Sequence, residues 1–158
     1  MEKRRIVWFA TAGLVVLSGC GDTAPETGAP DGESAMEAPM SSGSVTITQP
    51  MDGAEVAGPN VEIVFETQDL AVVEAGVMDA GTGHHHIFLD VDVTPMDEVI
   101  PAGVDGIIHK GDGTSVHLLE GVAPGSHRII AVVADGMHVP LDPPVVDTVM
   151  FTVTGGGQ

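Results

Sequence analysis

The sequence predicts an all-β fold, a single immunoglobulin-like β-sandwich of seven or eight short strands. Three observations support this fold class. Apolar and polar residues alternate with the two-residue period of half-buried strands, as in residues 45–49. Turns rich in glycine and proline separate these segments at short intervals, and no stretch keeps a helical period. The folded part, about 110 residues, has the size of one such sandwich, with a small barrel or jelly roll as the alternative.

Four strands are expected in the first half of the domain. They cover residues 45–49, 61–67, 71–75 and 84–93. Pro50-Met51-Asp52-Gly53 forms a turn after the first strand, and the opening of the domain resembles the first strand and turn of many bacterial immunoglobulin-like modules.

Four more strands are expected in the second half, at residues 107–110, 115–119, 127–134 and 146–153. Turns are expected at Gly111-Asp112-Gly113, Pro124-Gly125 and Asp135-Gly136. The first of these is too short to bind phosphate and is interpreted as a hairpin turn.

The N-terminus predicts export and lipidation. Three basic residues precede a short apolar run, and Leu17-Ser18-Gly19-Cys20 matches the lipobox, in which a peptidase cuts before a cysteine whose sulfur has received a diacylglycerol. An ordinary signal peptide or a short membrane anchor with an incidental cysteine is the alternative. Residues 1–19 are therefore expected to be a lipoprotein signal peptide, and the lipid on Cys20 to hold the protein on a membrane of the cell envelope. Gly21 favours sorting to the outer membrane if the cell is Gram-negative.

Residues 20–44 are expected to be a disordered, acidic tether carrying the lipidated cysteine. This segment contains three prolines and many small residues, with no apolar periodicity. The sandwich domain is then expected to span residues 45–154. With Cys20 lipidated, no cysteine remains for a disulfide, so stability comes from burial, with or without a bound metal.

The charge balance excludes several partners. Without residues 1–19 the chain has 22 acidic residues against only two basic ones, Lys110 and Arg128. So acidic a surface disfavours nucleic acid and the headgroups of anionic lipids, and it concentrates cations.

Three adjacent histidines, His84, His85 and His86, carry the main functional signal. On a strand His84 and His86 share one face with Asp90, whereas His85 points to the opposite face with the apolar row Ile87, Leu89, Val91 and Val93. That apolar row is expected to face the core. A His-x-His pair on a strand is able to bring two ring nitrogens onto one metal ion, while His85 is expected to cap the core by a hydrogen bond to backbone.

A metal site needs further ligands, and His109 and His138 are the preferred candidates. His117, His127, Asp90 and Met137 are further candidates, but His117 and His127 are expected to be structural like His85. Imidazole suits zinc and copper, and a thioether from Met137 or Met78 favours copper. Asp90 and Asp92 share a face and are interpreted as solvated residues or at best a calcium-ligand pair.

A family resemblance follows from these motifs. Gly83-His84-His85-His86-Ile87-Phe88-Leu89-Asp90 resembles the GHHHLLID signature of a bacterial domain of unknown function found in small exported proteins and lipoproteins. The resemblance extends over residues 109–115, 124–127, 135–140 and 143–146. Two histidines frequent in that family are replaced here by Ile107 and Leu141. The resemblance implies no activity.

The sequence thus favours a lipid-anchored envelope binding module, with a transition-metal site of zinc or copper at His84, His86, His109 and His138. The alternative is a structural or interaction module that binds an envelope protein and whose histidines hold no metal. No nucleophile motif such as G-x-S-x-G is present, so a metal-dependent oxidoreductase or hydrolase is the least favoured class.

Overall fold

The fold is all-β. A computed structural model describes residues 43–155, and within this range the chain forms nine strands and no helix. The strands are β1 (Ser44–Gln49), β2 (Ala54–Ala57), β3 (Val61–Gln68), β4 (Ala71–Val72), β5 (Thr82–Leu89), β6 (Ile107–Lys110), β7 (Val116–Leu119), β8 (Gly125–Ala134) and β9 (Val146–Thr154).

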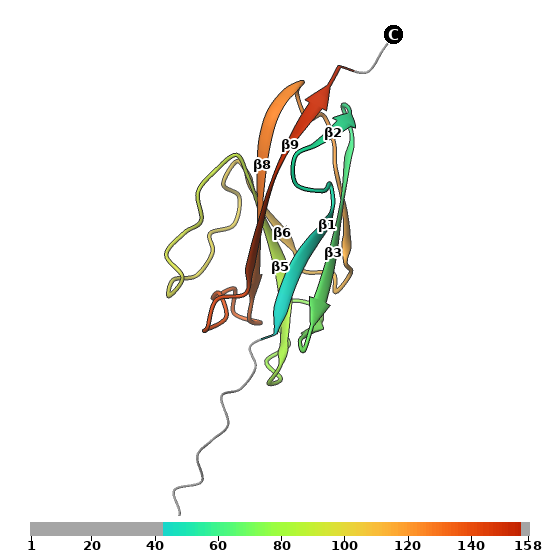
Figure 1. Cartoon of the computed structure of the whole chain (residues 1–158). Helices are drawn as coiled ribbons and strands as arrows, with labels where there is room; N and C mark the ends of the chain where they lie inside the picture. Colours follow the sequence, from blue (N-terminus) through green and yellow to red (C-terminus); the bar gives the residue numbers. More distant parts are fainter. Residues whose placement is uncertain (1–42, 156–158) are drawn as a thin grey trace, which may run out of the picture. The chain divides into compact units, whose positions relative to one another are not determined.

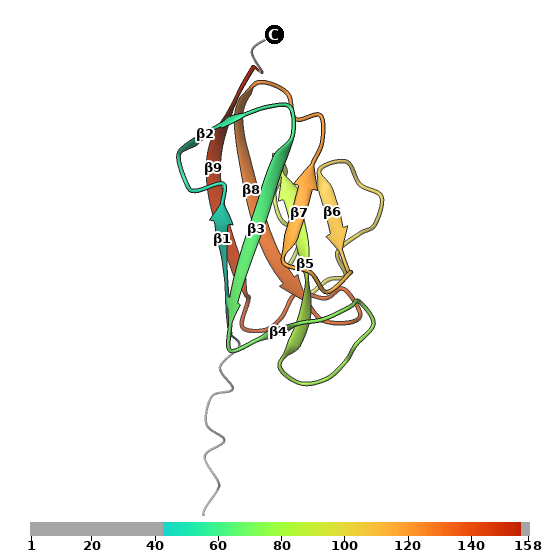
Figure 2. The same ribbon diagram turned by 90° about the vertical axis from the view of Figure 1, so that its right-hand side faces the viewer.

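These strands form two packed sheets, which confirms the predicted sandwich of the immunoglobulin-like class. One sheet has the order β1-β3-β7, and the other has the order β2-β9-β8-β5-β4, with β6 also paired to β5. Figure 2 shows the three-stranded sheet in front of the larger one. The chain changes sheets between β1 and β2, because β1 pairs with β3 whereas β2 pairs in parallel with β9.

The main core lies between the sheets. It combines side chains of β1 and β3, such as Ile47, Ile63 and Phe65, with side chains of β5, β8 and β9, such as Ile87, Ile129 and Phe151. The alternation that predicted the strands arises here, since each strand sends every second side chain into this layer.

A second, smaller apolar cluster covers the outer face of the large sheet. Phe88, Ile130 and Val132 point away from the main core and pack against Ile100 and Val91 of the long connection between β5 and β6. Figure 1 shows this connection, residues 90–106, extending beside β8. The face of β5 that carries His84 and His86 is therefore buried, where the sequence pattern indicated a polar face.

Three details differ from the predicted elements. The strand β2 was not predicted, and the chain now has nine strands in place of seven or eight. The histidine-bearing strand ends at Leu89, because Asp90 has a positive φ of 58° that turns the chain. As a result Val91 and Val93 pack in the outer cluster, not in the main core.

The Gly111-Asp112-Gly113 turn is not a hairpin. It connects β6 in the large sheet with β7 in the small one, so the two strands do not pair with each other. The predicted strand at residues 71–75 is reduced to β4, two residues paired in parallel with the start of β5.

The expected signal peptide, the lipidation at Cys20 and most of the expected tether lie outside the described residues. Within residues 43–155, no helix has the length and apolar character needed to cross a membrane.

Candidate metal centre

Four histidines gather at one end of the sandwich. The possible ligand nitrogens of His84, His86, His109 and His138 all lie within 4.8 Å of one another. The centroids of their rings are 4.7 to 5.6 Å apart. These are the four residues that the sequence predicts as metal ligands. All four lie together, although His84 and His86 with either His109 or His138 would suffice for a site with three ligands.

The strand register places three of the rings on one face. His84 and His86 are two residues apart on β5, so both point to the same side. His109 on β6 stands directly opposite His86 in the antiparallel pair. Directly opposed residues have Cβ atoms only about 4.5–5.5 Å apart, which is why a strand pair is able to assemble three imidazoles without any loop.

The fourth ring comes from the loop after β8. A tight turn forms there, in which the His138 N–H donates to the Asp135 carbonyl at 3.0 Å and Asp135 Oδ1 accepts from the amides of Met137 and Val139 at 2.8 and 3.0 Å. His138 itself has a φ of 68°, a left-handed conformation uncommon for a residue with a side chain. The carbonyl of His138 then accepts from the Ile100 N–H at 2.9 Å, which ties the turn to the outer cluster.

Two glycines make room for the cluster. A Cβ on Gly83 would lie 2.6 Å from Val133 and 2.9 Å from the Ala134 carbonyl oxygen, so glycine allows β5 to start close against β8. A Cβ on Gly111 would lie 2.5 Å from ring atoms of His109. The absence of a side chain at Gly83 therefore allows the close approach of the two strands, and its absence at Gly111 leaves space for the His109 ring.

The cluster is buried on one side and open on the other. His84 and His86 are 0% and 1% exposed. His109 is exposed and His138 is half-buried, so the opening lies on the side of β6 and of the loop after β8.

Burial keeps the buried rings neutral. Desolvation, helped by repulsion from His109 and His138, lowers the pKa of His84 to about 4. Desolvation also lowers the pKa of His86 to about 3, with repulsion from His84 as the next cause. The pKa of His109 is lowered too, first by burial and then by His138. Neutral imidazole is the form that binds a metal ion, so these rings are ready to bind at neutral pH.

The buried nitrogens are only partly satisfied. The Nε2 atoms of His84 and His86 lie 3.0 Å apart, so the N–H of one ring donates a hydrogen bond to the unprotonated nitrogen of the other. The Nδ1 atoms of both rings are buried, and within the described residues they have no hydrogen-bond partner. Buried polar atoms without partners are costly, so packing alone does not account for these two histidines.

His85 faces the main core, as strand parity predicts, but the expected hydrogen bond to backbone is wrong. Neither ring nitrogen of His85 has a partner among the described residues. The ring instead stacks on Phe65, with centroids 4.5 Å apart and an interplanar angle of 24°. Burial and then the nearby Lys110 lower the pKa of His85 to about 4.

His127 lies outside the cluster and joins three segments of the chain. Its Nδ1 is 2.7 Å from Asp90 Oδ2, and its Nε2 is 2.8 Å from the Ala123 carbonyl oxygen. Burial opposes protonation, but the hydrogen bonds to Asp90 and Ala123 outweigh it and raise the pKa of His127. Asp90 and Asp92 both bind the neighbouring Arg128. Asp90 accepts a hydrogen bond from the Arg128 N–H at 2.8 Å, and Asp92 forms an ion pair with the Arg128 guanidinium at 2.6 Å.

His117 on β7 is half-buried, and the buried Lys110 at the end of β6 lies near it. Lys110 is 5% exposed, and its Nζ lies 2.7 Å from Asp112 Oδ1. This ion pair holds the pKa of the Asp112 carboxyl well below its usual range. Asp112 also accepts from the Thr114 N–H at 3.1 Å, so the pair fixes the turn that follows His109.

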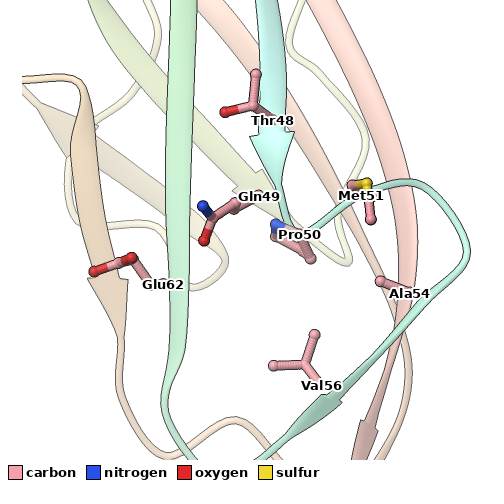
Figure 3. A pocket seen from close by; sticks show the side chains of 7 residues that line it. All are labelled: Thr48, Gln49, Pro50, Met51, Ala54, Val56 and Glu62. Atoms are coloured by element: carbon pink, nitrogen blue, oxygen red, sulfur yellow. The ribbon is translucent and has the colours of Figure 1, made fainter.

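Two surface grooves are lined by none of these rings. Figure 3 shows a groove of about 450 Å³ where β1 leaves β3, and Glu62 is its only acidic or basic lining residue. A second groove of similar size borders the loop after β8, and its lining includes Met96, Val139 and Leu141 but no histidine. Neither groove offers the donor set that the four-histidine cluster offers.

Comparison with known proteins gives a family without an established activity. The family described as a domain of unknown function, DUF4399, matches residues 63–154, a range that includes all four clustered histidines. The chain belongs to the DUF4399 family. The predicted resemblance to a domain of unknown function is thereby confirmed.

Similarity outside the DUF4399 family is limited. No curated protein matches the chain. Among solved structures, fibronectin(III)-like modules of CbhA from Clostridium thermocellum are similar, with 17% identity, a TM-score of 0.42, and coverage of 72% of this chain and 98% of that one.

Two residues that support the four clustered histidines were not expected from the sequence. Gly111 and Asp135 appeared only as parts of turns, although one makes room for His109 and the other shapes the loop of His138. Ile107 and Leu141, where the resemblance implied histidines, pack against the two apolar clusters, and the four rings come together without them.

Proposed function

We propose that this protein is a binding module of the cell envelope that holds one transition-metal ion, zinc or copper, through His84, His86, His109 and His138. The observation that carries the proposal is the convergence of the four ring nitrogens within 4.8 Å. Zinc binds imidazole nitrogen at about 2.0–2.1 Å, which puts neighbouring ligands of a tetrahedral ion about 3.3 Å apart. The Nε2 atoms of His84 and His86, which lie 3.0 Å apart, are already close to that spacing.

The donor set favours a borderline transition metal over calcium or magnesium. Calcium and magnesium prefer oxygen ligands, whereas imidazole suits zinc and copper. No carboxylate joins the group of four among the described residues. A metal ion would also accept lone pairs from the buried Nε2 atoms, which are otherwise limited to the single hydrogen bond between them.

The charge of the protein supports a cationic ligand. The whole chain carries a formal net charge of −18. Such a field raises the local concentration of metal cations and repels small anions. The negative charge of the chain therefore favours the binding of a metal cation over catalysis on an anionic substrate.

The envelope location is a second part of the proposal and rests on the sequence. The lipobox ending at Cys20 would place a lipid at the N-terminus of the mature chain, followed by a tether of about two dozen residues. Labelling with a fatty-acid probe is expected to mark the unaltered chain and to leave the Cys20→Ala variant unmarked. Equal labelling of the two chains, or no labelling of either, would contradict lipidation at Cys20 and would not bear on the metal site.

The metal site is tested by a chelator competition with zinc on the purified full chain. We expect one zinc ion per chain in the unaltered protein and a loss of roughly 100-fold or more in affinity for His84→Ala/His86→Ala, because two of four ligands are gone. His117→Ala removes a histidine that lies outside the cluster and is the matched control. Equal zinc binding by the double variant and the control would overturn the proposal in favour of structural histidines.

A further inference from the structure

Two exposed methionines lie at the loop that supplies His138. Met78 is 61% exposed and Met137 is 62% exposed. Met137 directly precedes His138 in the chain. The sulfur of Met78 lies 2.8 Å from the place that a Cβ on Gly136 would take, so Met78 rests on the same turn.

Burial in an apolar cluster does not account for these methionines. Neither belongs to the main core or to the outer apolar cluster. Methionine is flexible and carries a polarisable thioether, a soft ligand that selects cuprous copper. Exposed methionine also occurs elsewhere, as at Met51 in the groove of Figure 3, but there it has no histidine neighbour in sequence.

The turn with its methionines borders the open side of the histidine cluster. His84 and His86 are buried beneath, whereas His138 is half-buried and His109 is exposed. The loop that carries Met137, and on which Met78 rests, therefore lies at this opening. The nearby Asp135 uses Oδ1 to hold the turn, and it is not among the clustered ligands.

The charge of the donor set favours a monovalent ion. Four imidazoles are neutral, so a bound zinc ion would keep a charge of about +2 beside two fully buried rings, whereas a cuprous ion would keep about +1. Desolvation of a charge becomes more costly as the charge grows. A neutral nitrogen set with thioethers at its rim therefore suits cuprous copper better than zinc.

We propose that the four-histidine centre takes copper, and that Met78 or Met137 adds a thioether ligand when the ion is cuprous. This proposal rests on the proposed metal-binding function and specifies its metal. It assigns to the two methionines a role in binding one oxidation state, not in holding the fold.

The test is an anaerobic competition for cuprous copper against a colorimetric chelator, with zinc competition run in parallel. For Met78→Leu/Met137→Leu we expect cuprous affinity to fall by roughly tenfold or more and zinc affinity to stay unchanged. Met51→Leu, which removes an equally exposed methionine, is the control and is expected to leave both affinities unchanged.

The outcomes separate this proposal from the one on which it rests. If the unaltered chain binds zinc and cuprous copper, and the methionine double variant binds each ion as tightly as the unaltered chain does, the copper assignment is overturned and the metal site stands. If the double variant loses both ions equally, the methionines act on the loop and not as ligands, and the assignment is again overturned. If the unaltered chain holds neither ion, both proposals fall.

Discussion

The Nε2 atoms of His84 and His86 lie 3.0 Å apart in the interior of the protein, while the Nδ1 atoms of the same rings have no partner among the described residues. Two rings that serve only the fold would be expected to satisfy their buried nitrogens, because each unsatisfied group costs about 1–3 kcal/mol. The pair therefore carries a cost in stability, which a bound metal would offset. Binding to the folded state alone stabilises it by about 2.7 kcal/mol when the free ligand is at 100 times its Kd.

The metal-free protein should become more stable when this pair is made apolar. For His84→Leu/His86→Leu we expect the free energy of unfolding to rise by about 1–3 kcal/mol, because both unsatisfied rings are replaced by apolar groups of similar size. Urea unfolding in the presence of a chelator measures this change. A loss of more than about 1 kcal/mol would mean that the rings contribute to packing, as the structural alternative requires.

Acid should destabilise the metal-free protein. Burial lowers the pKa of His84 and His85 to about 4 and that of His86 to about 3 in the folded state. In the unfolded chain these rings take up protons near pH 6.5, so the unfolded state binds more protons as the pH falls below that value. Stability is therefore fully present above about pH 6.5 and is lost progressively toward pH 4 and below.

Urea unfolding at several pH values checks this dependence. The His84→Leu/His86→Leu variant is the control, since it lacks two of the three groups and should show a shallower slope. The prediction fails if both proteins lose stability equally between pH 7 and pH 4.5.

Gly111 should matter for metal binding although it offers no ligand. In Gly111→Ala the new methyl group would stand 2.5 Å from ring atoms of His109 and 2.8 Å from the Ala75 Cβ, so the His109 ring must leave the position that it holds in the cluster. We expect zinc affinity to fall by roughly 10- to 100-fold, the size of effect typical for residues that orient ligands. Gly155→Ala, at a site with open space and, like Gly111, without a positive φ, controls for the addition of a methyl group.

The network of His127 should depend on the charge of Asp90. Asp90→Asn keeps a residue that tolerates the positive φ of 58° but removes the carboxylate, so the pKa of His127 should fall. Asp90→Ala should in addition destabilise the fold by about 1–3 kcal/mol, because the Arg128 N–H and His127 lose their acceptor. An NMR titration of the His127 ring measures the first effect. An unchanged His127 pKa in Asp90→Asn would show that the Ala123 carbonyl alone sets it.

Much of this architecture follows from the sequence because strand parity is local. Alternation within residues 84–89 is sufficient to place His84 and His86 on one face and His85 on the other. The same local rule gave seven of the other strands to within a few residues, although β4 proved short and β2 was not expected. The four residues of β2 carry too few alternations to stand out, and their partner β9 lies about a hundred residues away in the chain.

The rest depended on contacts that the sequence does not encode locally. The outer face of β5 is buried because the irregular segment 90–106 folds back over Phe88. That segment has no regular alternation of apolar and polar residues from which its position could be predicted. The pairing of His86 with His109 is set by the register of β5 and β6, which are joined by a long connection. The turn that aims His138 depends on the side chain of Asp135 and on a left-handed residue, which is a property of the folded loop.

X-ray absorption spectroscopy of the zinc-loaded full chain tests the central claim most directly. The proposed centre predicts one zinc ion per chain with four imidazole nitrogens at about 2.0–2.1 Å, and a loss of that first shell in His84→Ala/His86→Ala. A first shell of carboxylate and water oxygens, or an imidazole shell unchanged in the double variant, would contradict a metal centre at these four histidines.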